Sequence, residues 1–171
     1  MQKIPTIFKR DLSLKCTPVT DEPNPDCQWV FDGEGIATRK IDGINVKGDG
    51  SQFLMRVKPS TEDYTEAEYA PFKDKFVDAA ILNNPLRFTP GVYEAYGENI
   101  RGNPERLEGY HLVRIAPRPD MALKLTQEPK RTYRDLMGYF ATNDIEGIVY
   151  HRGNGQMAKI KTKDFYHLAR P

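Results

Sequence analysis

The chain has 171 residues and a net charge of +1, with 39% hydrophobic and 29% charged residues. This size and composition indicate a single globular domain with a proper core, and they exclude a disordered chain. No apolar run approaches membrane-spanning length, and the first residues, MQKIPTIFKR, lack the apolar core of a signal peptide. A cytoplasmic protein with no membrane partner is therefore expected.

The first half of the sequence predicts an irregular segment, then strands, then a helix. Prolines punctuate residues 1–30, which are expected to be irregular and anchored by Trp29 and Phe31. Alternation and turn residues predict strands at 36–40, after Gly43, and at 52–58. A helix is expected over residues 60–83, capped by Ser60 or Thr61, with Pro71 as a point where it breaks in two.

The second half predicts four more strands and one short helix. Strands are expected at 87–97 and 110–116, separated by a loop, and a helix at 132–141 capped by Thr132. The last two strands, 147–151 and 156–162, are joined by Arg152-Gly153-Asn154-Gly155, a strong hairpin sequence.

The cysteines, the histidines and the local charge narrow the chemistry. Cys16 and Cys27 form neither a metal pattern nor a disulfide framework, so both are expected to be reduced thiols. The three histidines, at positions 111, 151 and 167, are too far apart to suggest a structural zinc site. The last 25 residues hold five basic residues and one acidic residue. That pattern is typical of a face that holds phosphates or of a solvated basic tail.

Several stretches carry residue types that suit nucleotide chemistry, and we give them here in chain order. They are Lys40-Ile41-Asp42-Gly43-Ile44-Asn45, Arg56, Tyr93-Glu94-Ala95-Tyr96-Gly97, Glu146-Gly147-Ile148-Val149 and Lys159-Ile160-Lys161. Lys40 ends an alternating strand and is followed at once by an Asp-Gly turn, a placement that suits a nucleophilic amine. Lys159 and Lys161 share one strand face by the period of two.

Taken together, these stretches resemble the nucleotidyltransferase domain of the covalent nucleotidyltransferase superfamily, which contains DNA ligases, RNA ligases and mRNA capping enzymes. The similarity is greatest to RNA ligases, because Asn45 completes the Lys-x-(Asp/His)-Gly-x-Asn form of the phage double-strand-specific group. The resemblance spans about residues 29–165. It implies an α+β, ATP-grasp-like nucleotidyltransferase domain of mainly antiparallel sheets flanked by helices, with residues 1–171 forming this one domain.

The resemblance also implies a catalytic set. Lys40 is the nucleophile, and Glu146 binds the catalytic metal, Mg²⁺ or Mn²⁺, or its water. Lys159 and Lys161 hold the α-phosphate of ATP. An ordinary lysine titrates near ~10.4, so only about one amine in a thousand is free at neutral pH. Positive neighbours, a metal and burial would activate Lys40, with Arg39, Lys159 and Lys161 as the candidate neighbours.

The implied nucleotide-binding set is wider than the catalytic set and, besides Lys159 and Lys161, includes Arg39. Asn45 contacts phosphate in the joining step, Arg56 contacts ribose or phosphate, and Glu94 holds the ribose hydroxyls. The base-stacking residue is expected on the strand 110–116, with His111, Tyr110 or an aliphatic residue as the alternatives.

The expected function is ATP-dependent RNA ligation on ends that carry a 5′-phosphate and a 3′-hydroxyl. No C-terminal oligonucleotide-binding-fold domain is expected, because the chain ends nine residues after Thr162. Either the domain acts alone as a minimal ligase, or a partner protein supplies nucleic-acid binding. The alternatives are a capping-type guanylyltransferase, a non-catalytic nucleic-acid-binding module of the same fold, and a structural protein with coincidental motifs.

Overall fold

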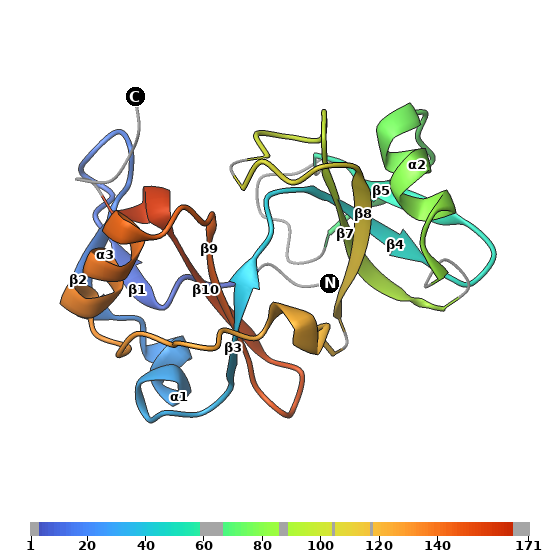
Figure 1. Ribbon diagram of the computed structural model, residues 1–171. Helices are drawn as coiled ribbons and strands as arrows, with labels where there is room; N and C mark the ends of the chain where they lie inside the picture. The colour runs from blue at the N-terminus through green and yellow to red at the C-terminus, as the bar shows by residue number, and fades with distance from the viewer. Residues whose placement is uncertain (1–3, 59–66, 86–88, 104, 117, 166–171) are drawn as a thin grey trace. The chain divides into compact units, whose positions relative to one another are not determined.

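The computed structural model describes residues 4–58, 67–85, 89–103, 105–116 and 118–165 (Figure 1). These residues form a mixed fold of mostly antiparallel sheets with few helices, which agrees with the predicted α+β class. The chain divides into two compact units: unit 1 is residues 1–3 and 41–120, and unit 2 is residues 4–40 and 121–171. In the described part of the chain, no helix has both the length and the apolar character needed to cross a membrane.

Unit 2 contains two small sheets and its helices come from both ends of the sequence. Its elements are β1 (Phe8–Arg10), β2 (Val19–Pro23), η1 (Pro25–Cys27), α1 (Gln28–Phe31), β3 (Ile36–Lys40), η3 (Met121–Leu123), α3 (Tyr133–Thr142), β9 (Gly147–His151), β10 (Met157–Lys161) and η4 (Thr162–Asp164). Strands β1 and β2 pair antiparallel, and β3, β9 and β10 form an antiparallel sheet in the order β10-β9-β3.

The core of unit 2 lies on one face of this three-stranded sheet. Ile148, Tyr150 and Ile160 project from that face and cluster with Leu136 and Phe140 of α3, all five of them buried. Helix α3 begins where predicted, because the Thr132 hydroxyl accepts a hydrogen bond from the backbone N–H of Asp135. The apolar side of the sheet is thereby covered, and its other side is left for polar residues.

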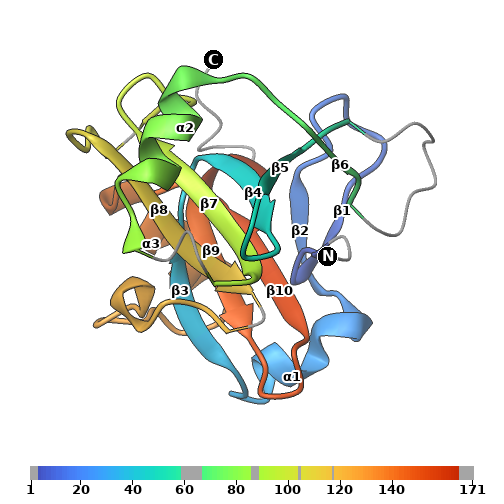
Figure 2. The ribbon, with the colours of Figure 1, turned by 90° about the vertical axis from the view of Figure 1, so that its right-hand side faces the viewer.

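In the residues that the structure describes, unit 1 is a five-stranded antiparallel sheet with the helix α2 packed on it. Its elements are β4 (Ile44–Gly48), β5 (Phe53–Arg56), β6 (Tyr69–Ala70), α2 (Lys75–Leu82), β7 (Gly91–Gly97) and β8 (Tyr110–Ala116), with the sheet order β6-β5-β4-β7-β8. Figure 2 shows α2 lying across β7 and β8. Val77, Ala80 and Ile81 of α2 pack on Tyr93 and Ala95 of β7.

The prediction for residues 1–30 is wrong in part, because this segment is not irregular throughout. It contains the β1–β2 hairpin, and residues 5–7 run alongside β10, where Thr6 forms a parallel bridge with Lys159. Strands of three to five residues carry little local pattern, and the bridge from Thr6 reaches a residue some 150 positions away in sequence.

The predicted helix over residues 60–83 is also wrong in part. Tyr69 and Ala70 form a strand paired with Arg56 and Met55, and the helix starts only at Lys75. Asp74 is its cap, since its carboxylate accepts hydrogen bonds from the backbone of Phe76 and Val77. The predicted caps, Ser60 and Thr61, lie outside the described residues.

Candidate active site

The predicted catalytic residues of unit 2 come together at one end of the three-stranded sheet. Gly147 on the central strand is paired on one side with Lys40 and on the other with Lys161. Glu146, one residue before Gly147, places its carboxylate across this row. Its Oε2 lies 2.5 Å from Lys40 Nζ and its Oε1 lies 2.9 Å from Lys161 Nζ. We call these four residues the lysine row.

The lysine row needs a glycine at its centre. A Cβ on residue 147 would lie 2.3 Å from the carbonyl oxygen of Ile160 and 2.9 Å from the Cα of Lys161. Both contacts are with backbone, so no side-chain movement relieves them. Gly147 therefore allows β10 to approach β9 closely at the point where both lysines meet the carboxylate.

The lysine row is largely withdrawn from water, so its charges are strongly felt. The exposed fractions of the side chains are 20% for Lys40, 15% for Glu146 and 19% for Lys161. Burial alone would raise the pKa of Glu146, but the adjacent Lys40 and Lys161 ammonium groups hold it below its usual value. Glu146 is thus a carboxylate at neutral pH and joins the two amines.

Lys159 stands on the same face, two residues before Lys161 and opposite Val149. Burial, together with the smaller effects of the positive charges of Lys161 and Lys40, lowers the pKa of Lys159 to about 8. The charges of Asp164 and Glu146 act in the opposite direction. Lys159 therefore remains mostly cationic at neutral pH, in a place where a phosphate would relieve the repulsion among the amines.

Arg39 precedes Lys40 on β3 and is opposite Ile148, a core residue. Because successive strand residues point to opposite faces, its side chain leaves the strand on the side away from Lys40. The structure thus brings Lys159 and Lys161 beside Lys40 on one face, but not Arg39. The proposed contact of Arg39 with the nucleotide stays a prediction.

A second polar pair lies next to the lysine row on this face. The buried hydroxyl of Thr38 is 2.9 Å from Nε2 of His151 and 3.2 Å from the carbonyl oxygen of Val149. Burial lowers the pKa of His151 to about 4, so the ring is neutral at physiological pH. This contact fixes the middle of β3 to β9 without adding a charge.

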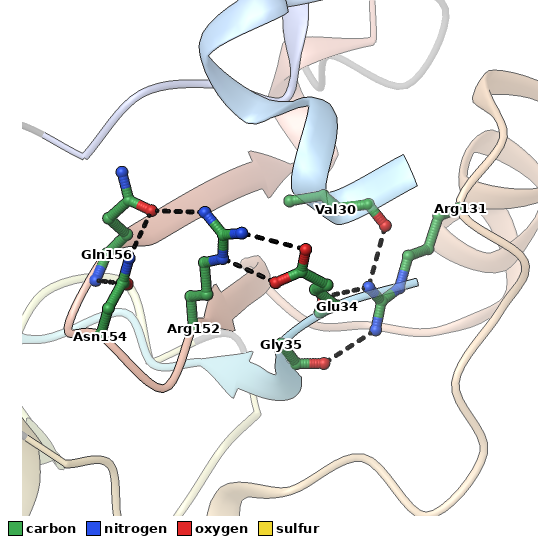
Figure 3. Close-up of polar contacts among 7 residues, drawn as sticks. All are labelled: Val30, Glu34, Gly35, Arg131, Arg152, Asn154 and Gln156. Carbon is green, nitrogen blue, oxygen red and sulfur yellow. Dashed lines mark hydrogen bonds and ion pairs between the residues drawn. The ribbon is translucent and has the colours of Figure 1, made fainter. Parts of the chain in front are cut away.

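The chain leading into β3 is held by two arginines (Figure 3). Arg131 donates hydrogen bonds to the backbone carbonyls of Val30, Glu34 and Gly35. Arg152 makes a two-pronged ion pair with the Glu34 carboxylate, with N···O distances of 2.7 and 3.0 Å. Arg152 is therefore matched by an acid and is not a free part of the basic C-terminal face predicted from sequence.

In unit 1, the other predicted residues form a polar row on the sheet face that is turned away from α2. Asn45 is paired with Glu94, and its side-chain amide donates to Glu94 Oε2 at 3.2 Å. The Tyr69 hydroxyl donates to Asn45 Oδ1 at 2.7 Å. Tyr69 is paired with Arg56 on the neighbouring strand. Burial raises the pKa of the Tyr69 hydroxyl; the charge of Arg56 lowers this pKa, and the charge of Glu94 raises it.

This polar row borders a hollow of about 590 Å³ in unit 1. Its lining includes Asn45, Arg56 and Glu94, together with two cations not singled out from sequence, Lys58 and Arg101. A hollow of this size that offers an amide, two carboxylates (Glu94 and Asp74) and several cations suits a ligand with hydroxyl and phosphate groups. Arg101 follows the glutamate strand in a loop whose residues have positive φ values at 99, 101, 103 and 106, a local feature that sequence alone does not show.

His111 lies opposite Tyr96 on the neighbouring strand, and the two rings stack with centroids 5.2 Å apart. Tyr96 is two residues from Glu94, so this aromatic pair is on the same sheet face as the polar row. Val113 is directly opposite Glu94 and is an aliphatic residue of β8 on that face. His111 and Val113 thus lie on the face of the polar row, whereas Tyr110 packs with the core around α2; which residue stacks on a base stays a prediction.

The residues present are suited to a magnesium ion that arrives with a nucleotide. Mg²⁺ in such sites is commonly held by one or two carboxylates together with substrate phosphates and waters. Glu146 supplies one carboxylate of this kind, 15% exposed and in contact with the amines of Lys40 and Lys161. In the described ranges, no three His, Cys, Asp or Glu side chains gather in a cluster that could hold an ion alone.

Two further residues of unit 2, Asp164 and Arg10, are connected to the lysine row, and the sequence did not predict this connection. Asp164 is buried and accepts a hydrogen bond from the backbone N–H of Lys161, and Arg10 forms an ion pair with Asp164. Arg10 lies in the segment that was predicted to be irregular.

Comparison of the sequence with models of protein families gives no match, and comparison with curated proteins gives none.

Proposed function

We propose that the protein is an ATP-dependent RNA ligase that acts through a covalent lysyl-AMP intermediate. The observation that carries the proposal is the lysine row: Lys40 and Lys161 share the Glu146 carboxylate, and Lys159 stands on the same face. A nucleophilic amine beside two further amines is an arrangement suited to attack on a phosphate, where negative charge builds up.

In the first step, Lys40 Nζ attacks the α-phosphorus of ATP. A nitrogen–phosphorus bond forms, the bond to the β-phosphate oxygen breaks, and pyrophosphate and a proton are released. Lys159 and Lys161 stabilise the charge on the α-phosphate oxygens. Glu146 is the residue that would hold Mg²⁺ or Mn²⁺, which would supply additional charge stabilisation at the phosphates when bound.

In the later steps, AMP moves from Lys40 to the 5′-phosphate of a polynucleotide, and a 3′-hydroxyl then displaces AMP to form the phosphodiester. The polar row of unit 1 supports the nucleotide-binding part of the proposal. Glu94 and Asn45 offer hydrogen-bonding groups for hydroxyls, and Arg56 offers a fork for phosphate. An ATP-grasp-like nucleotidyltransferase fold is part of the same proposal, as is a cytoplasmic location.

The deciding experiment is covalent labelling with α-labelled ATP or GTP, in Mg²⁺ or Mn²⁺, followed by denaturing electrophoresis. The informative variant is Lys40→Arg, because arginine keeps a positive charge for Glu146 but cannot act as a nucleophile at these pH values. Lys163→Ala, which removes an exposed lysine just after β10, is the matched control. We expect acid-labile label from ATP in the wild type and the control, and none in Lys40→Arg.

The other outcomes point to the alternatives. Label from GTP in place of ATP would indicate capping-type chemistry. Absence of label in folded protein shown by mass spectrometry to carry no nucleotide would refute the catalytic proposal. RNA binding with a steep salt dependence would then favour a non-catalytic module. For the joining steps, labelled protein is mixed with nicked duplex RNA or with single-stranded ends, and AMP-capped RNA and sealed product are measured.

A further inference from the structure

The N-terminal segment of unit 2 holds the backbone of Lys159. The backbone N–H of Lys159 donates to the carbonyl of Pro5 at 2.9 Å, and its carbonyl accepts from the N–H of Ile7 at 3.0 Å. Residues 5–7 thus lie along the outer edge of β10 and satisfy both backbone groups of this lysine. The position of Lys159 along and across the sheet is therefore set by a segment at the opposite end of the sequence.

Arg10 and Asp164 connect the same N-terminal segment to the end of β10. The Arg10 guanidinium donates to Asp164 Oδ1 at 2.7 Å, to the Thr6 hydroxyl at 3.1 Å and to the carbonyl of Thr17 at 2.7 Å. The other oxygen of Asp164 accepts from the backbone N–H of Lys161 at 2.9 Å. One carboxylate thereby connects the end of β10 to the N-terminal hairpin.

We propose that Arg10 and Asp164 are positioning residues for adenylylation, which hold Lys159 and Lys161 in place for the α-phosphate; this inference rests on the proposed function. The end of a strand frays unless its last backbone groups are held, and β10 ends at Lys161. Asp164 is only 4% exposed, and its two carboxylate oxygens accept hydrogen bonds from Arg10 and from the Lys161 backbone. Displacement of a catalytic group by about 1 Å can cost about a hundredfold in rate.

The charge of Asp164 supports the same role. It opposes the combined effect of burial and of the Lys161 and Lys40 charges, which lower the pKa of Lys159, and Glu146 acts in the same sense as Asp164. Asp164 therefore helps Lys159 to remain a cation that can bind phosphate.

The test measures single-turnover labelling by ATP in Asp164→Asn, Arg10→Gln and Arg10→Lys. The control is Lys9→Gln, which removes an exposed ion pair with Glu22 from the same strand β1. The amplitude of labelling counts the competent molecules, and the rate constant reports on the site itself. We expect Asp164→Asn and Arg10→Gln to lower the rate constant about tenfold or more and to raise the ATP concentration for half-saturation. Arg10→Lys, which keeps the charge but loses the fork, should fall between Arg10→Gln and the wild type.

A merely structural role would lower the amplitude and the melting temperature but leave the rate constant of the remaining molecules unchanged. That result would overturn the inference, as would wild-type kinetics in folded Arg10→Gln. Arg10 is only half-buried, so its variants decide the matter if Asp164→Asn does not fold. Absence of label in the wild type would refute the proposed function and this inference together. A labelled wild type with unchanged variants would refute this inference alone.

Discussion

The lysine row of unit 2 and the hollow of unit 1 both gather charged side chains, but they arrange them differently. In the lysine row, two amines share one carboxylate at contact distance, and the exposed fractions are 20% or less. In unit 1, an amide, a carboxylate and a phenol are hydrogen-bonded in a row beside a hollow with cations in its lining. The first arrangement is suited to a reaction at phosphorus, and the second to recognition of a ligand. Substitutions should therefore affect mainly the rate in unit 2 and mainly the affinity in unit 1.

The largest effect is expected from removing the carboxylate of each unit in turn. Glu146→Gln leaves Lys40 and Lys161 without their shared anion, and we expect the labelling rate at saturating ATP to fall by about a hundredfold or more. Glu94→Gln should instead raise the ATP concentration for half-saturation by roughly tenfold, with a smaller change in rate. Single-turnover labelling across ATP concentrations separates the two. Equal rate losses in both variants would remove the distinction between the units.

The next effect is a dependence on pH that belongs to unit 2. We expect labelling to decline as the pH rises through about 8, because Lys159 loses its proton and its hold on the phosphate. The sign for stability is opposite. The folded-state pKa is below the ordinary value of 10.5, so the unfolded chain binds more protons between about 8 and 10.5, and this group favours folding as the pH rises. If labelling is lost between about pH 8 and 10.5, the titration of Lys159 does not cause this loss by unfolding the protein.

The matched variant for this prediction is Lys159→Arg, which stays charged throughout the range. Its alkaline decline should disappear or move to a higher pH, whatever its rate at neutral pH. A decline near pH 8 that persists in Lys159→Arg would assign the titration to another group. Glu94→Gln should keep the alkaline decline of the wild type, because Glu94 is not among the charges that shift Lys159.

The smallest effects compare one glycine from each unit. A Cβ at Gly147 would meet the Ile160 carbonyl oxygen at 2.3 Å, and one at Gly43 would meet the Ala95 carbonyl oxygen, also at 2.3 Å. Each substitution by alanine should lower the free energy of unfolding by about 1–3 kcal/mol, measured by urea denaturation. Gly147→Ala should also slow labelling, whereas Gly43→Ala, close to Glu94, should mainly weaken ATP binding. Gly138→Ala in α3, where a Cβ meets nothing within 4 Å, should stabilise by about 0.5–1 kcal/mol. A destabilised Gly138→Ala would show that these clash distances do not predict stability here.

Local patterns in the sequence were sufficient for most strands. Alternation and turn residues predicted β3, β8 and β9 with the bounds that the structure has, and the hydroxyl of Thr132 predicted the start of α3. Both cysteines are free, as expected. The local sequence pattern gave wrong predictions for segments whose structure depends on a neighbouring strand. Residues 69–70 became a strand because β5 offers them an edge, and residues 5–7 lie beside β10 through one bridge between Thr6 and Lys159.

The same division holds for the candidate site. From the sequence alone came the identity of the candidate groups, because a lysine at the end of a predicted strand, a carboxylate and two lysines at a spacing of two can be read directly in the chain. Only the tertiary structure decided which of them meet. Lys40 reaches Glu146 across 106 positions, and Arg10 reaches Asp164 across 154. Strand period and turn chemistry act over a few residues, whereas contacts of this range depend on how strands pair and which faces are buried, so Arg39 was separated from the lysine row and Arg10 was connected to it.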